Sequence, residues 1–247
     1  MATIINPYRY AAAGGACVDC GTASRSFDGS NDFINFGSDG SIDNIFDSGG
    51  SVSFWAKLNA FTNDMRFINK NDCRGTSGRE WGIYFLANDL TFEYHYSTTR
   101  LIRNTTGDAF PGASTSTSQW VHVVVTYTAT EGTTPTIYFD SVAEVSLSGN
   151  DGTGTRNSDA GDDLIVGSSA GVAQWLNGQM SDIRLYTKIL TQDDVDDLYA
   201  FNDVTDNLVA HWKLIETGTN PTFADSSTNN NTGTNNGTTE STDGPAD

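Results

Sequence analysis

The sequence predicts an all-β protein with a single short helix. Apolar and polar side chains alternate in several segments, which is the pattern of half-buried strands. Clusters of Gly, Asn, Asp and Ser separate these segments, as turns do between strands. Hydrophobic residues make up only 37% of the 247 residues, but the 13 Phe, 9 Tyr and 5 Trp each bury a large area. The chain can therefore build one core, provided that two sheets share it.

The predicted strands follow one another from residue 25 onward. Residues 51–58 place one set of apolar side chains on a single face: Val52, Phe54, Ala56 and Leu58. Residues 120–127, WVHVVVTY, are rich in β-branched and aromatic side chains, which suits a central strand. Further strands are expected at residues 92–96, 137–139, 164–166, 180–186 and 208–214.

One helix is expected, at about residues 191–200. Thr191 is a good N-cap, and Asp194 follows three residues later as in a capping box. Val195 and Leu198 then recur at helical spacing. This predicts about two turns lying against one end of the sheets.

Composition divides the chain into three parts. Residues 1–24 are small, Gly/Ala-rich and without periodicity, so they predict an extended arm. Residues 25–216 predict one β domain that includes the strand at 208–214. Residues 217–247 are rich in Thr, Asn and Gly, and composition alone predicts that this segment is disordered.

The net charge of −18 argues against nucleic-acid binding, because such a surface repels phosphate backbones. No apolar run approaches the length of a membrane span, so membrane insertion is not expected. The first residues lack the basic start and apolar core of a secretory signal. We therefore expect a protein made in the cytoplasm, which could leave its cell inside a virus particle.

The three cysteines do not predict a complete disulfide framework, because their number is odd. Cys17 and Cys20 have the spacing of a metal knuckle, but a zinc site needs two further ligands. Cys73 and a distant histidine are poor candidates for these two further zinc ligands. Our interpretation is a pair of ordinary thiols in an N-terminal loop.

Six segments resemble, in order and spacing, the concanavalin A-like (laminin-G-like) family. They begin with SFDGSNDFI at residues 26–34 and continue with residues 52–57, 119–127, 137–141, 178–186 and 190–199. The resemblance implies two antiparallel sheets packed as a jelly-roll sandwich. It does not fix a function, since members include sugar-binding modules, adhesion modules, glycosidases and virion proteins.

One departure from the family concerns the strand at residues 208–214. In the family its counterpart comes before the FDGSND segment, whereas here it comes last. Three explanations are open: a circular permutation, an exchange of this strand with a neighbouring copy, or a fragment of a tandem array. We favour the permutation, because the termini of such sandwiches lie close together and an unfilled slot exposes a sheet edge.

The resemblance also implies a calcium ion at one rim of the sandwich. Calcium takes six to eight oxygen ligands from carboxylates and carbonyls on turns. The predicted ligands are Asp28, Asn31, Asp32, Asp182 and Asp225. The alternative for the turn at Asp28 is that its side chain caps the backbone.

No catalytic set is legible in the sequence. The Glu-x-Asp-x-x-Glu run of concanavalin A-like glucanases is absent, and Glu80, Glu93, Glu131 and Glu144 stand apart from other acids at strand spacing. The three histidines lie within strand patterns. A non-enzymatic protein is therefore expected.

Glycan binding would use aromatic rings that stack on sugar faces, aided by polar loop side chains. The predicted rings are Trp81, Tyr94, Tyr96 and Trp175, and the alternative for most of them is burial in the core.

The favoured function is a surface component of a bacteriophage virion: a capsid decoration, head-fibre or tail-fibre protein. The expected anchor to the particle consists of Asn6, Pro7, Tyr8, Arg9 and Tyr10. Its expected partners are other virion proteins, further copies of itself and host-surface glycans. The alternative is a carbohydrate-binding or adhesion module of a bacterial surface protein, and a glycoside hydrolase is a weaker third hypothesis.

Overall fold

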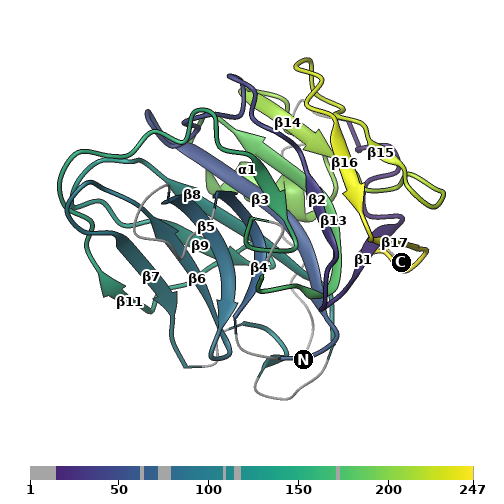
Figure 1. The fold of residues 1–247 in the computed structure, drawn as a ribbon, viewed down its shortest axis with the longest axis horizontal. Coiled ribbons are helices and arrows are strands. Elements are labelled where there is room, and N and C mark those ends of the chain that lie inside the picture. The colour runs from purple at the N-terminus through teal and green to yellow at the C-terminus, as the bar shows by residue number, and fades with distance from the viewer. Residues whose placement is uncertain are drawn as a thin grey trace, which may run out of the picture.

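A computed structural model describes residues 15–61, 64–71, 79–107, 110–113, 118–170 and 173–246. Over these ranges the chain forms two antiparallel sheets packed face to face, with one helix, as Figure 1 shows. This confirms the all-β, two-sheet sandwich with a single short helix. The predicted anchor, from Asn6 to Tyr10, lies outside the described residues.

The eight-stranded sheet has the order β10-β9-β8-β3-β13-β1-β17, with β14 also paired to β13. Its strands are β1 (Ser24–Asp28), β3 (Gly50–Leu58), β8 (Val121–Tyr127), β9 (Thr136–Phe139), β10 (Val142–Ala143), β13 (Asn177–Tyr186), β14 (Leu208–Trp212) and β17 (Thr239–Ser241). The strands expected at 51–58, 120–127, 137–139, 180–186 and 208–214 all lie in this sheet.

The nine-stranded sheet has the order β11-β7-β6-β5-β4-β12-β2-β16-β15. Its strands are β2 (Phe33–Asn35), β4 (Met65–Asn71), β5 (Arg79–Leu86), β6 (Asp89–Tyr94), β7 (Leu101–Thr105), β11 (Leu147–Asn150), β12 (Leu164–Val166), β15 (Thr222–Phe223) and β16 (Gly233–Asn236). The inward side chains of both sheets form one aromatic-rich core. For example, Phe54 of β3 meets Phe67 of β4 with ring centroids 5.3 Å apart.

Helix α1 (Gln192–Tyr199) covers the outer face of the eight-stranded sheet. Thr191 and Asp194 form the expected capping box. Val195 and Leu198 pack in a second apolar cluster with Val124 of β8, separate from the main core. No helix in the described ranges is long and apolar enough to cross a membrane.

Strand β14 fills a place in the sheet of its own chain. It pairs antiparallel with β13, with Trp212 opposite Ile183. Trp212 is fully buried, and its ring stacks on Phe36 with centroids 3.8 Å apart. This pairing within one chain is what the circular permutation requires, and the permutation itself stays a prediction.

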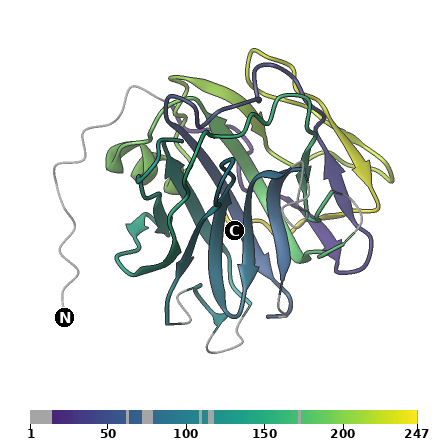
Figure 2. The same cartoon turned by 60° about the vertical axis from the view of Figure 1, so that its left-hand side comes forward.

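The boundary predicted at residue 216 is wrong, and so is the expectation of disorder beyond it. β16 pairs with β2, and β17 pairs with β1, so the C-terminal segment adds strands to both sheets. In Figure 2 this yellow segment lies beside the purple N-terminal strands. The jelly roll therefore extends to at least Ser241.

Polar contacts, rather than apolar ones, hold much of this segment in place. The buried amide of Asn235 donates to the carbonyl of Thr238 at 3.0 Å. The fully buried Arg25 of β1 donates through Nε to Thr238 Oγ1 and through Nη1 to the carbonyl of Glu216. A hydrophobicity pattern cannot reveal such a segment, because its inward groups are amides and hydroxyls.

Candidate functional site

Three of the four predicted glycan-stacking rings are buried, which corrects that prediction. Trp81 and Tyr94 lie in the core, and the Trp81 indole donates to Asp159. Tyr96 is only 6% exposed, and its hydroxyl is 2.6 Å from that of Tyr127. Trp81 of β5 and Tyr94 of β6 occupy inward positions of their strands, and Tyr96 follows two residues after Tyr94.

Trp175 is the predicted ring that stays half-exposed. Its centroid lies 6.2 Å from that of Phe33, with the two planes tilted by 38°. Phe33 and Asn35 of β2 are both half-exposed, whereas Ile34 between them is fully buried. Phe33 and Asn35 therefore point outward from the nine-stranded sheet.

A groove of about 390 Å³ opens over β2 and β16 on this outer face. The strand register places Asn236 opposite Phe33 and Thr234 opposite Asn35. The lining residues are Phe33, Asn35, Phe36, Gly37, Asp163, Thr232, Thr234 and Asn236. The groove therefore combines one outward ring with amide, carboxylate and hydroxyl groups.

The polar wall of the groove is ordered by its own hydrogen bonds. Asn35 Nδ2 donates to Asp163 Oδ2 at 2.8 Å, and Asn35 Oδ1 accepts from the amide of Gly37 at 2.6 Å. These bonds fix which way the Asn35 amide faces. A sugar hydroxyl, which both donates and accepts, finds both kinds of partner along this wall.

Most of the groove was missed by the sequence reasoning. Asn236 and Thr234 fall in the segment that composition assigned to disorder. Phe33 entered the sequence analysis only as part of the family motif at residues 26–34, and Asn35 lies just beyond that motif.

The structure does not gather the predicted calcium ligands into one cluster. Asp28 Oδ1 accepts from the amides of Ser30 and Asn31, at 2.8 and 3.2 Å, so it caps its own turn. Asp32 Oδ2 accepts from the amide of Asp28 at 2.9 Å. Both contacts agree with the alternative to calcium binding, in which these side chains cap the backbone of the turn. Asn31, the third predicted ligand in this turn, is exposed.

The other two predicted ligands lie on either side of His211. Asp225 Oδ1 accepts from the His211 amide at 2.9 Å, and Asp182 Oδ1 lies 2.7 Å from His211 Nε2. Asp182 also accepts two hydrogen bonds from Arg184, each 3.1 Å long. Although burial opposes ionisation, Arg184 and His211 hold the pKa of Asp182 well below its usual range. Calcium binding by this set stays a prediction.

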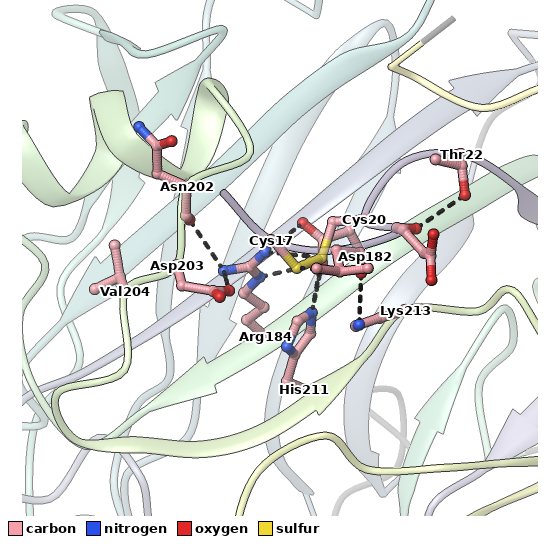
Figure 3. The surroundings of a disulfide bond; sticks show 12 residues. Cys17, Cys20, Thr22, Asp182, Arg184, Asn202, Asp203, Val204, His211 and Lys213 are labelled. Atoms are coloured by element: carbon pink, nitrogen blue, oxygen red, sulfur yellow. Dashed lines mark hydrogen bonds and ion pairs between the residues drawn. A yellow bond between two sulfur atoms is a disulfide. The ribbon is translucent and has the colours of Figure 1, made fainter. Parts of the chain in front are cut away.

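The interpretation of Cys17 and Cys20 as ordinary thiols is wrong, because the two form a disulfide. Figure 3 shows it directly over Asp182, Arg184 and His211. Arg184 Nη2 donates to Cys20 Sγ at 3.3 Å. In the described ranges, one group of three His, Cys, Asp or Glu ligand atoms lies within 4.8 Å: those of Cys17, Cys20 and His211.

All three histidines are buried, at 7% exposure or less. His122 Nε2 lies 2.9 Å from Ser53 Oγ, and burial lowers the pKa of His122 to about 3. His95 and Arg100 instead bind the buried carboxylate of Glu93. The Ser53–His122 contact joins β3 to β8, and Glu93 of β6 holds His95 together with the exposed Arg100.

Glu80 of β5 is a buried acid with a strongly shifted titration. It is 6% exposed, and its Oε2 has no hydrogen-bond partner among the residues that the structure describes. Burial, together with the carboxylates of Asp162 and Asp159, raises its pKa to about 8. Glu80 is therefore protonated in the folded protein at neutral pH, whereas an unfolded chain ionises it near 4.5.

We expect Glu80→Gln to stabilise the protein at neutral and mildly alkaline pH. Since the unfolded chain loses the proton first, wild-type stability falls as pH rises from 4.5 to about 8. The variant lacks this loss. Its advantage over the wild type in free energy of unfolding should therefore be larger at pH 8 than at pH 5 by about 2 kcal/mol. Urea unfolding across this range measures it, with Glu131→Gln, an exposed position, as the control. An unchanged pH slope in Glu80→Gln contradicts the prediction.

Comparison with known proteins identifies the family to which this fold is similar. Residues 28–196 match the family model described as the concanavalin A-like lectin/glucanases superfamily. A search of curated proteins found no match.

Similar solved structures share the fold at low sequence identity. A suspected carbohydrate-binding protein of Bacteroides ovatus has a TM-score of 0.61 and 17% identity, covering 90% of this chain and 60% of its own. The receptor-binding domain of botulinum neurotoxin mosaic serotype C/D has a TM-score of 0.54 and 16% identity, covering 76% and 44%. A heptameric pentraxin of Limulus polyphemus has a TM-score of 0.50 and 15% identity, covering 74% and 84%.

The chain thus spans 60% and 44% of the first two of these structures. At such identities the likeness concerns the fold alone. The family model, in contrast, covers well over half of the sequence, from the turn at Asp28 to helix α1. The chain belongs to the concanavalin A-like lectin/glucanase superfamily.

Proposed function

We propose that this chain is a non-enzymatic carbohydrate-binding domain, and that the groove over β2 and β16 holds the sugar. The observation that carries the proposal is the half-exposed ring pair Phe33 and Trp175 beside the polar wall of Asn35 and Asp163. Rings beside ordered amide and carboxylate groups match the two faces of a pyranose, one apolar and one hydroxylated.

The similar structures support a ligand of this class. One of them is a suspected carbohydrate-binding protein, and another is the receptor-binding domain of a toxin. The groove is open and shallow, which suits one or two units of a longer glycan.

The virion role predicted from the sequence concerns where the domain works, not what it binds. The residues expected to attach it, Asn6 to Tyr10, lie outside the described residues. That role and self-association of the domain stay predictions. The binding groove suits either setting, a phage surface protein or a bacterial surface module.

We expect single alanine variants of Phe33, which lines the groove, and of Trp175, whose ring contacts Phe33, to weaken glycan binding about tenfold. Phe33→Ala and Trp175→Ala each remove a ring, and about 1–1.5 kcal/mol of contact energy corresponds to roughly that factor. A glycan array, with calcium and with a chelator, selects the strongest oligosaccharide. Titration calorimetry with that oligosaccharide then measures the affinity of each variant.

The matched control is Trp120→Ala. Trp120 is the other half-exposed tryptophan, and it lies away from the groove, with its indole bonded to Asp243. This variant should bind as the wild type does. If the groove variants keep full affinity while binding is real, the sugar lies elsewhere. If no glycan binds at all, the proposed function is wrong.

A further inference from the structure

The turn that carries Cys17 and Cys20 is built firmly onto the outer layer of the eight-stranded sheet. The amide of Cys17 donates to the carbonyl of Phe201 at 2.8 Å, and that of Asp203 donates to the carbonyl of Gly15 at 2.9 Å. Lys213 Nζ donates to the carbonyl of Val18 at 2.6 Å. The segment thus crosses β14 at a fixed place, with Cys20 only 3% exposed.

This placement sets the cysteine sulfurs against a histidine nitrogen. Cys20 Sγ lies 3.6 Å from His211 Nε2, and these atoms and Cys17 Sγ lie within 4.8 Å of one another. Tetrahedral zinc with Zn–S of about 2.3 Å and Zn–N of about 2.0 Å separates a sulfur from a nitrogen by about 3.5 Å. The observed separation of 3.6 Å is close to this value, so a reduced Cys20 and His211 are placed to share one zinc ion.

The fourth candidate ligand is a carboxylate that contacts His211. Asp182 Oδ1 lies 2.7 Å from the same His211 nitrogen, and both side chains are buried. Its other oxygen, Oδ2, accepts from Arg184 Nη2 at 3.1 Å, which orients the carboxylate. The bulge in β13 between Ser181 and Arg184 brings Asp182 to this face.

The charges of such a site balance, as a buried site requires. Two thiolates and the Asp182 carboxylate carry three negative charges, and a divalent cation with the Arg184 guanidinium carries three positive ones. Arg184 Nη2, 3.3 Å from Cys20 Sγ, already donates to one of the sulfurs. Such a donor stabilises a metal-bound thiolate from the outer shell.

We propose that the reduced chain binds one zinc ion through Cys17, Cys20, His211 and Asp182. The disulfide form cannot bind it, since its sulfurs are bonded to each other. A dithiol reductant opens the bond: it supplies two electrons and two protons, yields two cysteine thiols and becomes a disulfide itself. Zinc then displaces the two thiol protons. The site thus has two forms, an oxidised disulfide and a reduced zinc complex. Both hold the N-terminal turn in place.

Cobalt(II) is the probe that tests this site, because it replaces zinc and reports its own geometry. The full chain is reduced, freed of reductant under nitrogen and titrated with Co²⁺. We expect binding of one Co²⁺ per chain, with sulfur-to-cobalt charge-transfer absorption and the intense visible bands of tetrahedral cobalt. Added zinc should displace the Co²⁺ and so remove these absorption bands. The oxidised chain should show neither signal.

Variants assign the ligands. Cys17→Ser and Cys20→Ser should each weaken Co²⁺ binding at least about tenfold and remove part of the charge-transfer band. Cys73→Ser is the matched control and should bind as the wild type does. Because His211 is buried, His211→Ala could fail to fold, whereas Cys17 is only half-buried and its serine variant keeps the test decisive. Far-UV circular dichroism checks each fold.

Three outcomes overturn the proposal. In the first, the reduced wild type binds no stoichiometric Co²⁺. In the second, Cys17→Ser and Cys20→Ser bind it as tightly as the wild type. In the third, Cys73→Ser abolishes the signal.

Discussion

A chain that ends at Glu216 should not fold cooperatively, although all the segments that resemble the family motif series from residues 26 to 199 remain in it. Removing residues 217–247 deletes β15, β16 and β17, and it exposes the edges of β1 and β2. Arg25 stays behind without the partner groups of Thr238. A buried cation that loses its partners costs several kcal/mol, and the lost ladders add to this, so we expect a loss above about 5 kcal/mol.

Thermal unfolding followed by circular dichroism measures this effect. The control is a chain that ends at Gly244, which keeps β17 and the bonds of Asp243 to Lys57 and Trp120. It should lose about 1 kcal/mol or less, since it gives up mainly the bond from the Ala246 amide to Gly21. A 216-residue chain with a wild-type melting curve would show that the C-terminal strands are dispensable.

Arg184→Met should destabilise the protein by about 3–5 kcal/mol at pH 7. Arg184 is 1% exposed and Asp182 is 3% exposed, so the variant leaves a buried carboxylate without its cation. His211 remains beside it but is only one of its two partners. Urea unfolding at pH 7 gives the free energy directly.

Two further variants separate the ion pair from general damage. Arg156→Met removes an ion pair with Asp47 in which both side chains are partly exposed, and it should change stability by less than about 1 kcal/mol. In Asp182→Asn/Arg184→Met, the uncompensated charge is gone, so this double variant should be more stable than Arg184→Met alone. Equal losses in the single and double variants would contradict the assigned cause.

The strands and the helix were predictable because their residues carry local signals. Alternation in residues 51–58 and the Thr191–Asp194 capping box each depend only on near neighbours in sequence. The C-terminal strands carry no such signal. Thr238 is buried against Arg25 of β1, 213 residues away in sequence, so a segment that looks like a solvated tail joins both sheets.

The site was less predictable than the fold. Residue type singled out Trp81 and Tyr94 as sugar-stacking rings, yet their place in the alternation assigns them to the core. The groove combines Phe33 with Asn236, which are neighbours only after β16 pairs with β2. In the same way, Cys20 and His211 meet across 191 residues of sequence. Sites of this kind depend on the strand register, which a single sequence does not display.

A crystal of the protein soaked with the strongest array oligosaccharide tests the central claim most directly. The account predicts sugar density in the groove over β2 and β16, with a pyranose ring against Phe33 or Trp175 and hydroxyls bonded to Asn35 and Asp163. Density over any other part of the sandwich, with this groove empty, would contradict it.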